Sequence, residues 1–226
     1  MRRHRTTFID EKLAVEAVVC ERVSMVGSLL TGRNTGNIAM CSIDRLERYD
    51  KPPKFELIIH SWDIGATIEG NPSVCTKWGV TKVAGRDIFH LIDVVRLKLE
   101  LPDVRAAIKA HDKLDKPDLI VIDHRGAGIG VEQDLRKAGY CHLYAASKDG
   151  TSNDSKIYRF GRALLYMYDG VVKYPVSAPF LEDVFYALAA FPGLKEFDLI
   201  DSITQLVAYP QNALMFARQK HPPANL

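Results

Sequence analysis

The sequence lacks several features that would each point to a particular class of protein. It contains no run of about 18 apolar residues, so we expect no membrane-spanning segment. The basic start, Met1–Arg5, is not followed by an apolar stretch, so no secretory signal is predicted. The cysteines form no CxxC pair, which favours buried, reduced thiols in a cytosolic protein over a zinc site or disulfides. They are Cys20, Cys41, Cys75 and Cys141.

The sequence also lacks a marked excess of positive or negative charge. Among 226 residues, 30 are Lys or Arg and 28 are Asp or Glu, which gives a formal net charge of +2. This balance neither requires nor excludes a polyanionic partner, so any surface for nucleic acid would have to be a local patch. A hydrophobic content of 47% is typical of a globular domain with a substantial core.

The pattern from residue 55 onward predicts a mixed α/β architecture. Three strand-like runs, at 55–64, 74–83 and 88–97, are joined by short turn-rich segments, which indicates an antiparallel meander. Helices and strands then alternate. Helices are predicted at 102–114, 130–138, 155–168, 178–190 and 198–209, and strands at 119–123, 142–145 and 171–174.

This order of elements is that of the ribonuclease H-like fold, in which the first strand lies centrally in the sheet. We expect the compact domain to span residues 55–212. Residues 1–54 are interpreted as an N-terminal extension or linker with one short helix at 42–50. Residues 213–226 are interpreted as a C-terminal tail.

Three acidic residues stand at the ends of apolar elements. Asp63 ends the first strand, Asp123 ends the strand at 119–123, and Asp198 opens the last helix. An ionised carboxylate in such a place needs a partner, because its desolvation is costly. Asp201 lies one helical turn after Asp198 and shares its helix face. Several acids from separate elements are what two hard ions such as Mg²⁺ require for phosphodiester hydrolysis.

Each of these acids also has an ordinary structural interpretation. Asp63 could cap a turn, Asp123 could be a loop acid and Asp198 could cap its helix. Asp201 could be solvated or salt-bridged. The glycine-rich segment 126–130 could cradle a nucleotide, but it does not match GxGxxG and favours a tight strand-to-helix turn.

Basic residues gather on the helix predicted at 155–168. Lys156, Arg159 and Arg162 fall on neighbouring turns of this helix. They could contact DNA phosphates, or they could form a solvated helix face.

These residues together resemble the nuclease domain of the large terminase subunit of tailed phages and prophages. The similarity extends over about residues 42–210. The segments that carry it include Ser61-Trp-Asp-Ile-Gly65, Val121-Ile-Asp-His-Arg-Gly126, Asp154-Ser-Lys156 with Arg159, and Phe197-Asp-Leu-Ile-Asp-Ser202.

The resemblance implies a metal-dependent endonuclease that cuts concatemeric double-stranded DNA during genome packaging in the bacterial cytoplasm. It implies Mg²⁺ or Mn²⁺ as cofactor, held by Asp63, Asp123 and Asp198, with Asp201 as a further acid. The implied partners are the terminase small subunit, the packaging ATPase domain and the portal. The motif of that ATPase, GxxxxGK[ST], is absent from the sequence, so we do not expect the chain to drive translocation by itself.

Two departures from the family pattern stand out. The middle acid of the family is often Glu, whereas Asp123 is one methylene shorter. Phe197 replaces the first of two acids that usually open the third motif.

The alternative functions are another ribonuclease H-like nuclease, such as a junction resolvase, and a catalytically silent module for DNA binding or assembly. A phosphotransferase of the actin-like fold is a weaker alternative.

Overall fold

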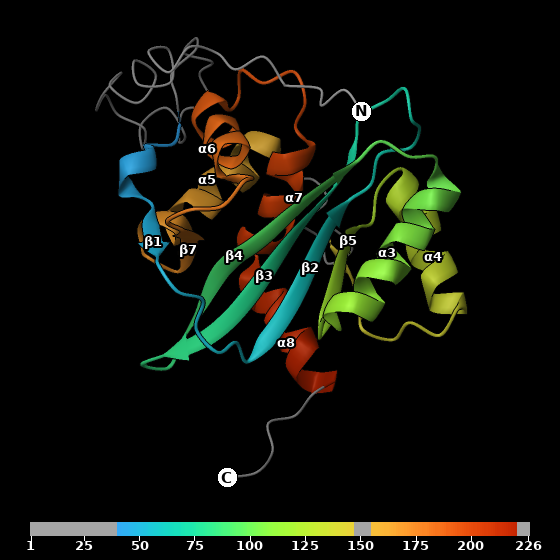
Figure 1. The fold of residues 1–226 in the computed structure, drawn as a ribbon, viewed down its shortest axis with the longest axis horizontal. Helices are drawn as coiled ribbons and strands as arrows, with labels where there is room; N and C mark the ends of the chain where they lie inside the picture. The colour runs from blue at the N-terminus through green and yellow to red at the C-terminus, as the bar shows by residue number, and fades with distance from the viewer. Residues whose placement is uncertain (1–39, 147–154, 221–226) are drawn as a thin grey trace.

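The fold is built on one seven-stranded sheet with helices on both faces (Figure 1). The computed structural model describes residues 40–146 and 155–220. The strands are β1 (Glu47–Tyr49), β2 (Leu57–Asp63), β3 (Ser73–Val83), β4 (Arg86–Leu97), β5 (Leu119–Asp123), β6 (Leu143–Ala146) and β7 (Val172–Pro175). The helices are η1 (Ile43–Arg45), α3 (Leu101–Asp115), α4 (Ala127–Lys137), α5 (Lys156–Tyr168), α6 (Leu181–Ala190), α7 (Asp198–Val207) and α8 (Pro210–Lys220).

The order of strands across the sheet is β1-β7-β4-β3-β2-β5-β6. Strands β2, β3 and β4 form the predicted antiparallel meander. The remaining neighbours pair in parallel, β5 with β2, β6 with β5, β7 with β4 and β1 with β7. Only β3 therefore runs against the other strands. Because β2 and β5 are parallel neighbours near the middle of the sheet, their carboxyl ends meet at the same edge.

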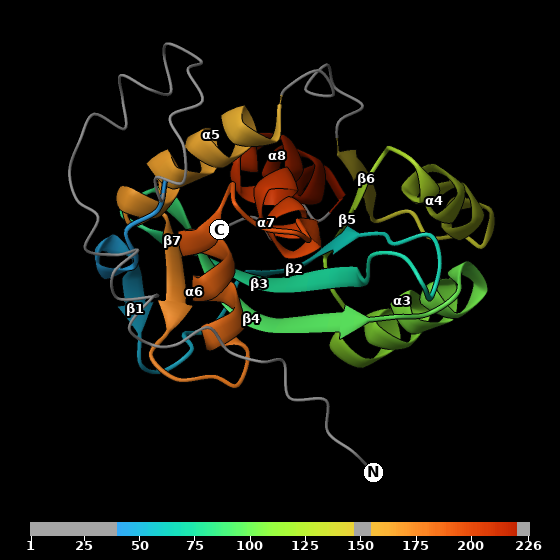
Figure 2. The same cartoon turned by 90° about the horizontal axis from the view of Figure 1, so that it is seen from above.

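Two apolar cores lie on opposite faces of the sheet. In β5, Leu119 and Val121 belong to the larger core, whereas Ile120 and Ile122 belong to the smaller one. This division follows from the alternation of side chains along a strand. The larger core is covered by α5 to α8 and the smaller by α3 and α4, as Figure 2 shows from above.

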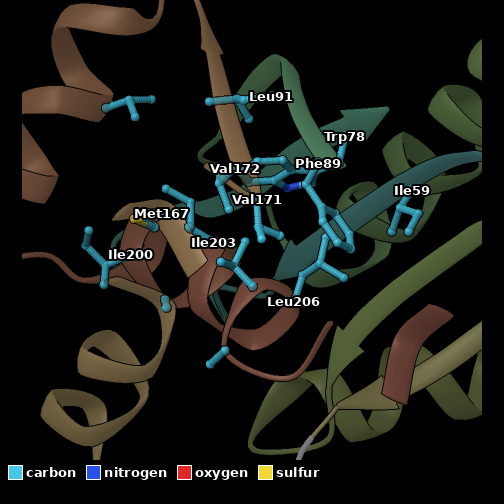
Figure 3. Close-up of a cluster of buried hydrophobic side chains, with 14 of the residues drawn as sticks. Ile59, Trp78, Phe89, Leu91, Met167, Val171, Val172, Ile200, Ile203 and Leu206 are labelled. Carbon is cyan, nitrogen blue, oxygen red and sulfur yellow. The ribbon is translucent and has the colours of Figure 1, made fainter. Parts of the chain in front are cut away.

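Helix α7 is the central element of the larger core. Every residue of α7 is buried, so the helix is covered on all sides rather than along one stripe. Figure 3 shows Ile203 and Leu206 of α7 among side chains from the sheet, including Trp78 and Phe89. This packing fixes the position of the helix that begins with Asp198.

The segment before residue 55 differs from its prediction. A single helix was predicted at 42–50, but a short η1 is followed there by β1, which pairs with β7 at the sheet edge. Two of the three residues of β1 are exposed, so its sequence carries no apolar alternation. The predicted extension also includes residues 1–39, which lie outside the described residues.

Other boundaries also differ from the prediction, including those of α8 and α4. Residues 213–220 were assigned to a tail but belong to α8, whose Ala213, Leu214 and Ala217 are buried in the larger core. The predicted tail also includes residues 221–226, which lie outside the described residues. Helix α4 begins at Ala127, three residues before its predicted start, because the glycine-rich segment is already helical.

The described cysteines are free thiols, as the sequence favours. Cys41 and Cys75 are buried, whereas Cys141 is exposed; Cys20 lies outside the described residues. None of the helices in the described ranges is both long and apolar enough to cross a membrane.

Candidate metal centre

Two of the predicted acids lie at the carboxyl ends of neighbouring strands. Asp63 ends β2 and Asp123 ends β5, and the pairing of these strands runs up to the residue before each acid. By alternation, Asp63 shares the sheet face of Ile59, and Asp123 shares the face of Val121. Both of these apolar residues belong to the larger core. The two carboxylates therefore face the layer that contains α7.

Hydrogen bonds hold the first turns of α7 against this edge. The Ser61 hydroxyl donates to the carbonyl of Ser202 at 2.7 Å, and the Thr76 hydroxyl donates to the same carbonyl at 3.1 Å. The side-chain amide of Gln205 donates to the Ser61 oxygen at 2.9 Å. Ser61 lies two residues before Asp63 and Ser202 directly follows Asp201, so these bonds bring the acids of the helix to the acid of the strand.

The negative charges of the other three acids act on Asp63. The pKa of Asp63 is raised to about 8, first by burial and then by the negative charges of Asp201, Asp198 and Asp123. Burial also raises the pKa of Asp198, although a hydrogen bond from Asn71 opposes the increase. Asp198 Oδ2 is buried without a hydrogen-bond partner. These shifts are those of carboxylates that crowd one partly desolvated site.

Basic side chains neutralise two of the four acids. Both oxygens of Asp123 accept hydrogen bonds from Arg125. The Nε of Arg125 lies 3.1 Å from Asp123 Oδ1 and 2.9 Å from Oδ2, and its Nη2 lies 2.7 Å from Oδ2. Asp201 forms ion pairs with Lys156 and with Arg159, whose Nη2 lies 2.7 Å from Asp201 Oδ1. Among the described residues, Asp123 and Asp201 therefore form ion pairs, whereas Asp63 and Asp198 form none.

Comparison with known proteins finds similarity in structure and none in sequence. No model of a known protein family and no curated protein matches the chain. Among solved structures, the nuclease domain of the P22 large terminase matches with a TM-score of 0.50 and 15% identity, over 78% of this chain and 93% of that domain.

The chain has the fold of a large terminase nuclease domain.

Two more solved structures show weaker similarity to this terminase nuclease fold. The nuclease domain of the SPP1 large terminase, determined with bound Mn, has a TM-score of 0.48 and 13% identity, over 75% of this chain and 97% of that domain. RuvC of Thermus thermophilus has a TM-score of 0.39 and 12% identity, over 75% of this chain and 99% of that protein. The predicted resemblance to terminase nuclease domains and the ribonuclease H-like fold class are confirmed at the level of fold.

The acids are not arranged as a finished metal cluster. Within the described ranges, no three His, Cys, Asp or Glu side chains are placed so that they could hold one metal ion together. In the structure, Asp123 is turned toward Arg125, and Asp201 toward two cations. The donors nevertheless suit a hard divalent ion, since all are carboxylate oxygens and the buried Asp198 Oδ2 has no other partner.

The three predicted basic residues have different surroundings. Lys156 is 49% exposed and lies beside Asp201, so it could meet a phosphate. Arg159 was predicted on a DNA-facing surface, but its side chain is only 3% exposed because it reaches inward to Asp201. Arg162 donates to the carbonyl of Ala208 and stacks on Tyr209, at the junction of α7 and α8.

The sequence interpretation missed Arg125 and Asn71 as neighbours of the acids. Arg125 stands two residues after Asp123, and that spacing is the only sign of their ion pair in the sequence. Asn71 lies in the loop between β2 and β3, and nothing in the sequence relates it to Asp198. His124, which directly follows Asp123, lies with its Nδ1 3.2 Å from Oε2 of Glu132.

Proposed function

We propose that this chain is a metal-dependent endonuclease that cuts concatemeric double-stranded DNA during phage genome packaging. The observation that supports this proposal most strongly is the convergence of four carboxylates from β2, β5 and α7 in a terminase nuclease fold. Acids from separate elements, held at one edge of a sheet, provide oxygen ligands for divalent ions.

In this proposal, Asp63, Asp123 and Asp198 hold Mg²⁺ or Mn²⁺, with Asp201 as a further acid. Divalent ions held by these carboxylates would supply an activated water molecule and charge stabilisation at the leaving oxygen of the phosphodiester. In the metal-free state the carboxyl of Asp63 retains its proton up to about pH 8. Asp201 is the least available ligand, because the buried Arg159 neutralises it.

The exposed ammonium of Lys156 supports a DNA substrate. It lies beside the acids and also over the ring of Phe197, at 4.8 Å from the ring centre. Phe197 stands where the family pattern has an acid, and its ring helps to fix the position of Lys156. From there the ammonium can contact a backbone phosphate next to the reacting one.

The same resemblance suggests where the chain acts. We propose that it works in the cytoplasm of a bacterial host, together with a packaging ATPase domain, the terminase small subunit and the portal. The ATPase must be supplied by a separate segment or protein, since the sequence contains no GxxxxGK[ST].

Replacing Asp63 with Asn tests the proposed nuclease. Asp63→Asn keeps the size of the side chain and removes a proposed metal ligand. We expect Mn²⁺-dependent cleavage of plasmid and linear duplex DNA by the full chain to fall at least about a hundredfold, because even groups that only orient metal ligands contribute about 10- to 100-fold. The rate of cleavage, followed on agarose gels, provides the measurement.

The matched control is Asp169→Asn, which makes the same chemical change at an exposed acid paired with Arg86. Arg86 begins β4, at the end of the sheet opposite Asp63. This variant should cleave like the wild type. Preferred cutting of a four-way junction over linear duplex would instead indicate a resolvase. Equal metal-dependent activity in wild type and Asp63→Asn would rule out the proposed site.

A further inference from the structure

The two arginine ion pairs of the acidic site differ in how easily they can open. The Arg125 side chain is 39% exposed and belongs to the short turn between β5 and α4. The Arg159 side chain is 3% exposed and lies within α5. Arg125 can move into water at little cost in desolvation, whereas removing Arg159 would leave the buried Asp201 with the exposed Lys156 in place of a buried cation.

The contact of Arg125 with Asp123 engages both carboxylate oxygens. Nε lies within hydrogen-bonding distance of both oxygens, and Nη2 lies 2.7 Å from Oδ2. A planar guanidinium binds a carboxylate well in this forked arrangement. A metal ion that coordinated Asp123 would need the same oxygens.

The charge of Arg125 also acts on the rest of the site. Its pKa is raised first by the hydrogen bonds to Asp123, and the charges of Asp201 and Asp63 add to the increase. The guanidinium therefore lies within the field of three of the four acids, in the region where a divalent cation would be attracted.

We propose that Arg125 is an internal counter-ion, which takes the place of a metal cation on Asp123 in the metal-free protein and is displaced when a divalent ion binds. This inference rests on the proposed function of the site as a metal centre. Arg125 would then lower the affinity for the ion, because its ion pair with Asp123 must be broken first. It would also keep the acids from repelling one another when no ion is present.

The affinity of the full chain for Mn²⁺, measured by isothermal titration calorimetry, tests the proposal. Arg125→Gln should bind Mn²⁺ about tenfold more tightly than the wild type, since the ion pair with Asp123 no longer competes with the metal ion. The matched control is Arg105→Gln, which removes the same charge from an ion pair with Asp134 between α3 and α4. The control should bind Mn²⁺ like the wild type.

A second measurement follows Arg125 itself in the wild-type chain. In the wild-type chain, the Nε–H resonance of Arg125, identified by its loss in Arg125→Gln, should shift during a titration with Mg²⁺. Unchanged or weaker Mn²⁺ affinity in Arg125→Gln, or a resonance that stays fixed while Mg²⁺ binds, would overturn the counter-ion role. Absence of Mn²⁺ binding in wild type and variant alike would overturn the proposed metal centre itself.

Discussion

In metal-free solution at pH 8, Asp63→Asn should be more stable than the wild type by about 2–3 kcal/mol. The reason is that the wild-type protein must ionise a carboxyl group whose pKa is raised to about 8 by burial and by three neighbouring acids. One unit of pKa corresponds to about 1.4 kcal/mol, and the partial exposure of Asp63 to solvent reduces the full effect. For a chain of this size, the gain corresponds to a rise in Tm of about 5–10 °C.

The sign of the pH dependence follows from the raised pKa. The folded state binds the Asp63 proton more tightly than the unfolded state, so this group stabilises the wild type least at high pH. Its contribution is fully present below the ordinary pKa of 3.8 and is lost as the pH rises toward about 8. The advantage of Asp63→Asn should therefore grow from pH 5 to pH 8. Urea denaturation in the presence of EDTA measures it at each pH.

Adding Mg²⁺ should reverse the order of the two proteins. The ion stabilises a folded state that binds it, and the variant has lost a ligand. The variant Asp169→Asn, whose acid is exposed beside Arg86, should follow the wild type at every pH. A metal-free Asp63→Asn protein that is less stable than the wild type at pH 8 would show that Asp63 is not a destabilising charge in the folded state.

The sequence was most informative where several apolar residues lie together. The strand at Leu119–Asp123 was predicted with the bounds that the structure shows, since five residues in a row are buried. The acids at the ends of such strands stood out because carboxylates are costly in apolar surroundings. The order of strands and helices then indicated the fold. In contrast, β1 was missed because a three-residue edge strand with two exposed side chains carries no periodicity.

The ion pairs of the site could not be predicted in the same way. Arg159 precedes Asp201 by 42 residues, and only the packing of α5 on α7 brings the two together. The sequence suggested a surface residue, because arginine is rarely buried unless it is paired. Arg125 was missed for a different reason, since the fold of a short turn determines whether a side chain reaches back two residues.

Gly128→Ala should be strongly damaging, although it adds a single methyl group near the site. A Cβ on Gly128 would lie 2.0 Å from the carbonyl oxygen of Asp123 and 3.3 Å from Cγ2 of Ile122. The first contact is with backbone, so it cannot be relieved by rotating a side chain. We expect the free energy of unfolding to fall by at least about 3 kcal/mol, at the upper end of overpacking costs. Asp123 would also be displaced, so Mn²⁺ affinity should fall with stability.

Gly130→Ala separates this close approach from the effect of helix propensity. Gly130 lies in the same first turns of α4, and a Cβ there would have no neighbour within 4 Å. Both substitutions place alanine in the helix, which favours folding by about 0.8–1.0 kcal/mol when nothing else changes. Gly130→Ala should therefore be more stable than the wild type and retain its Mn²⁺ affinity, whereas Gly128→Ala loses both. Urea denaturation of the two variants measures the difference, and equal stabilities would mean that α4 can shift away from Asp123 without cost.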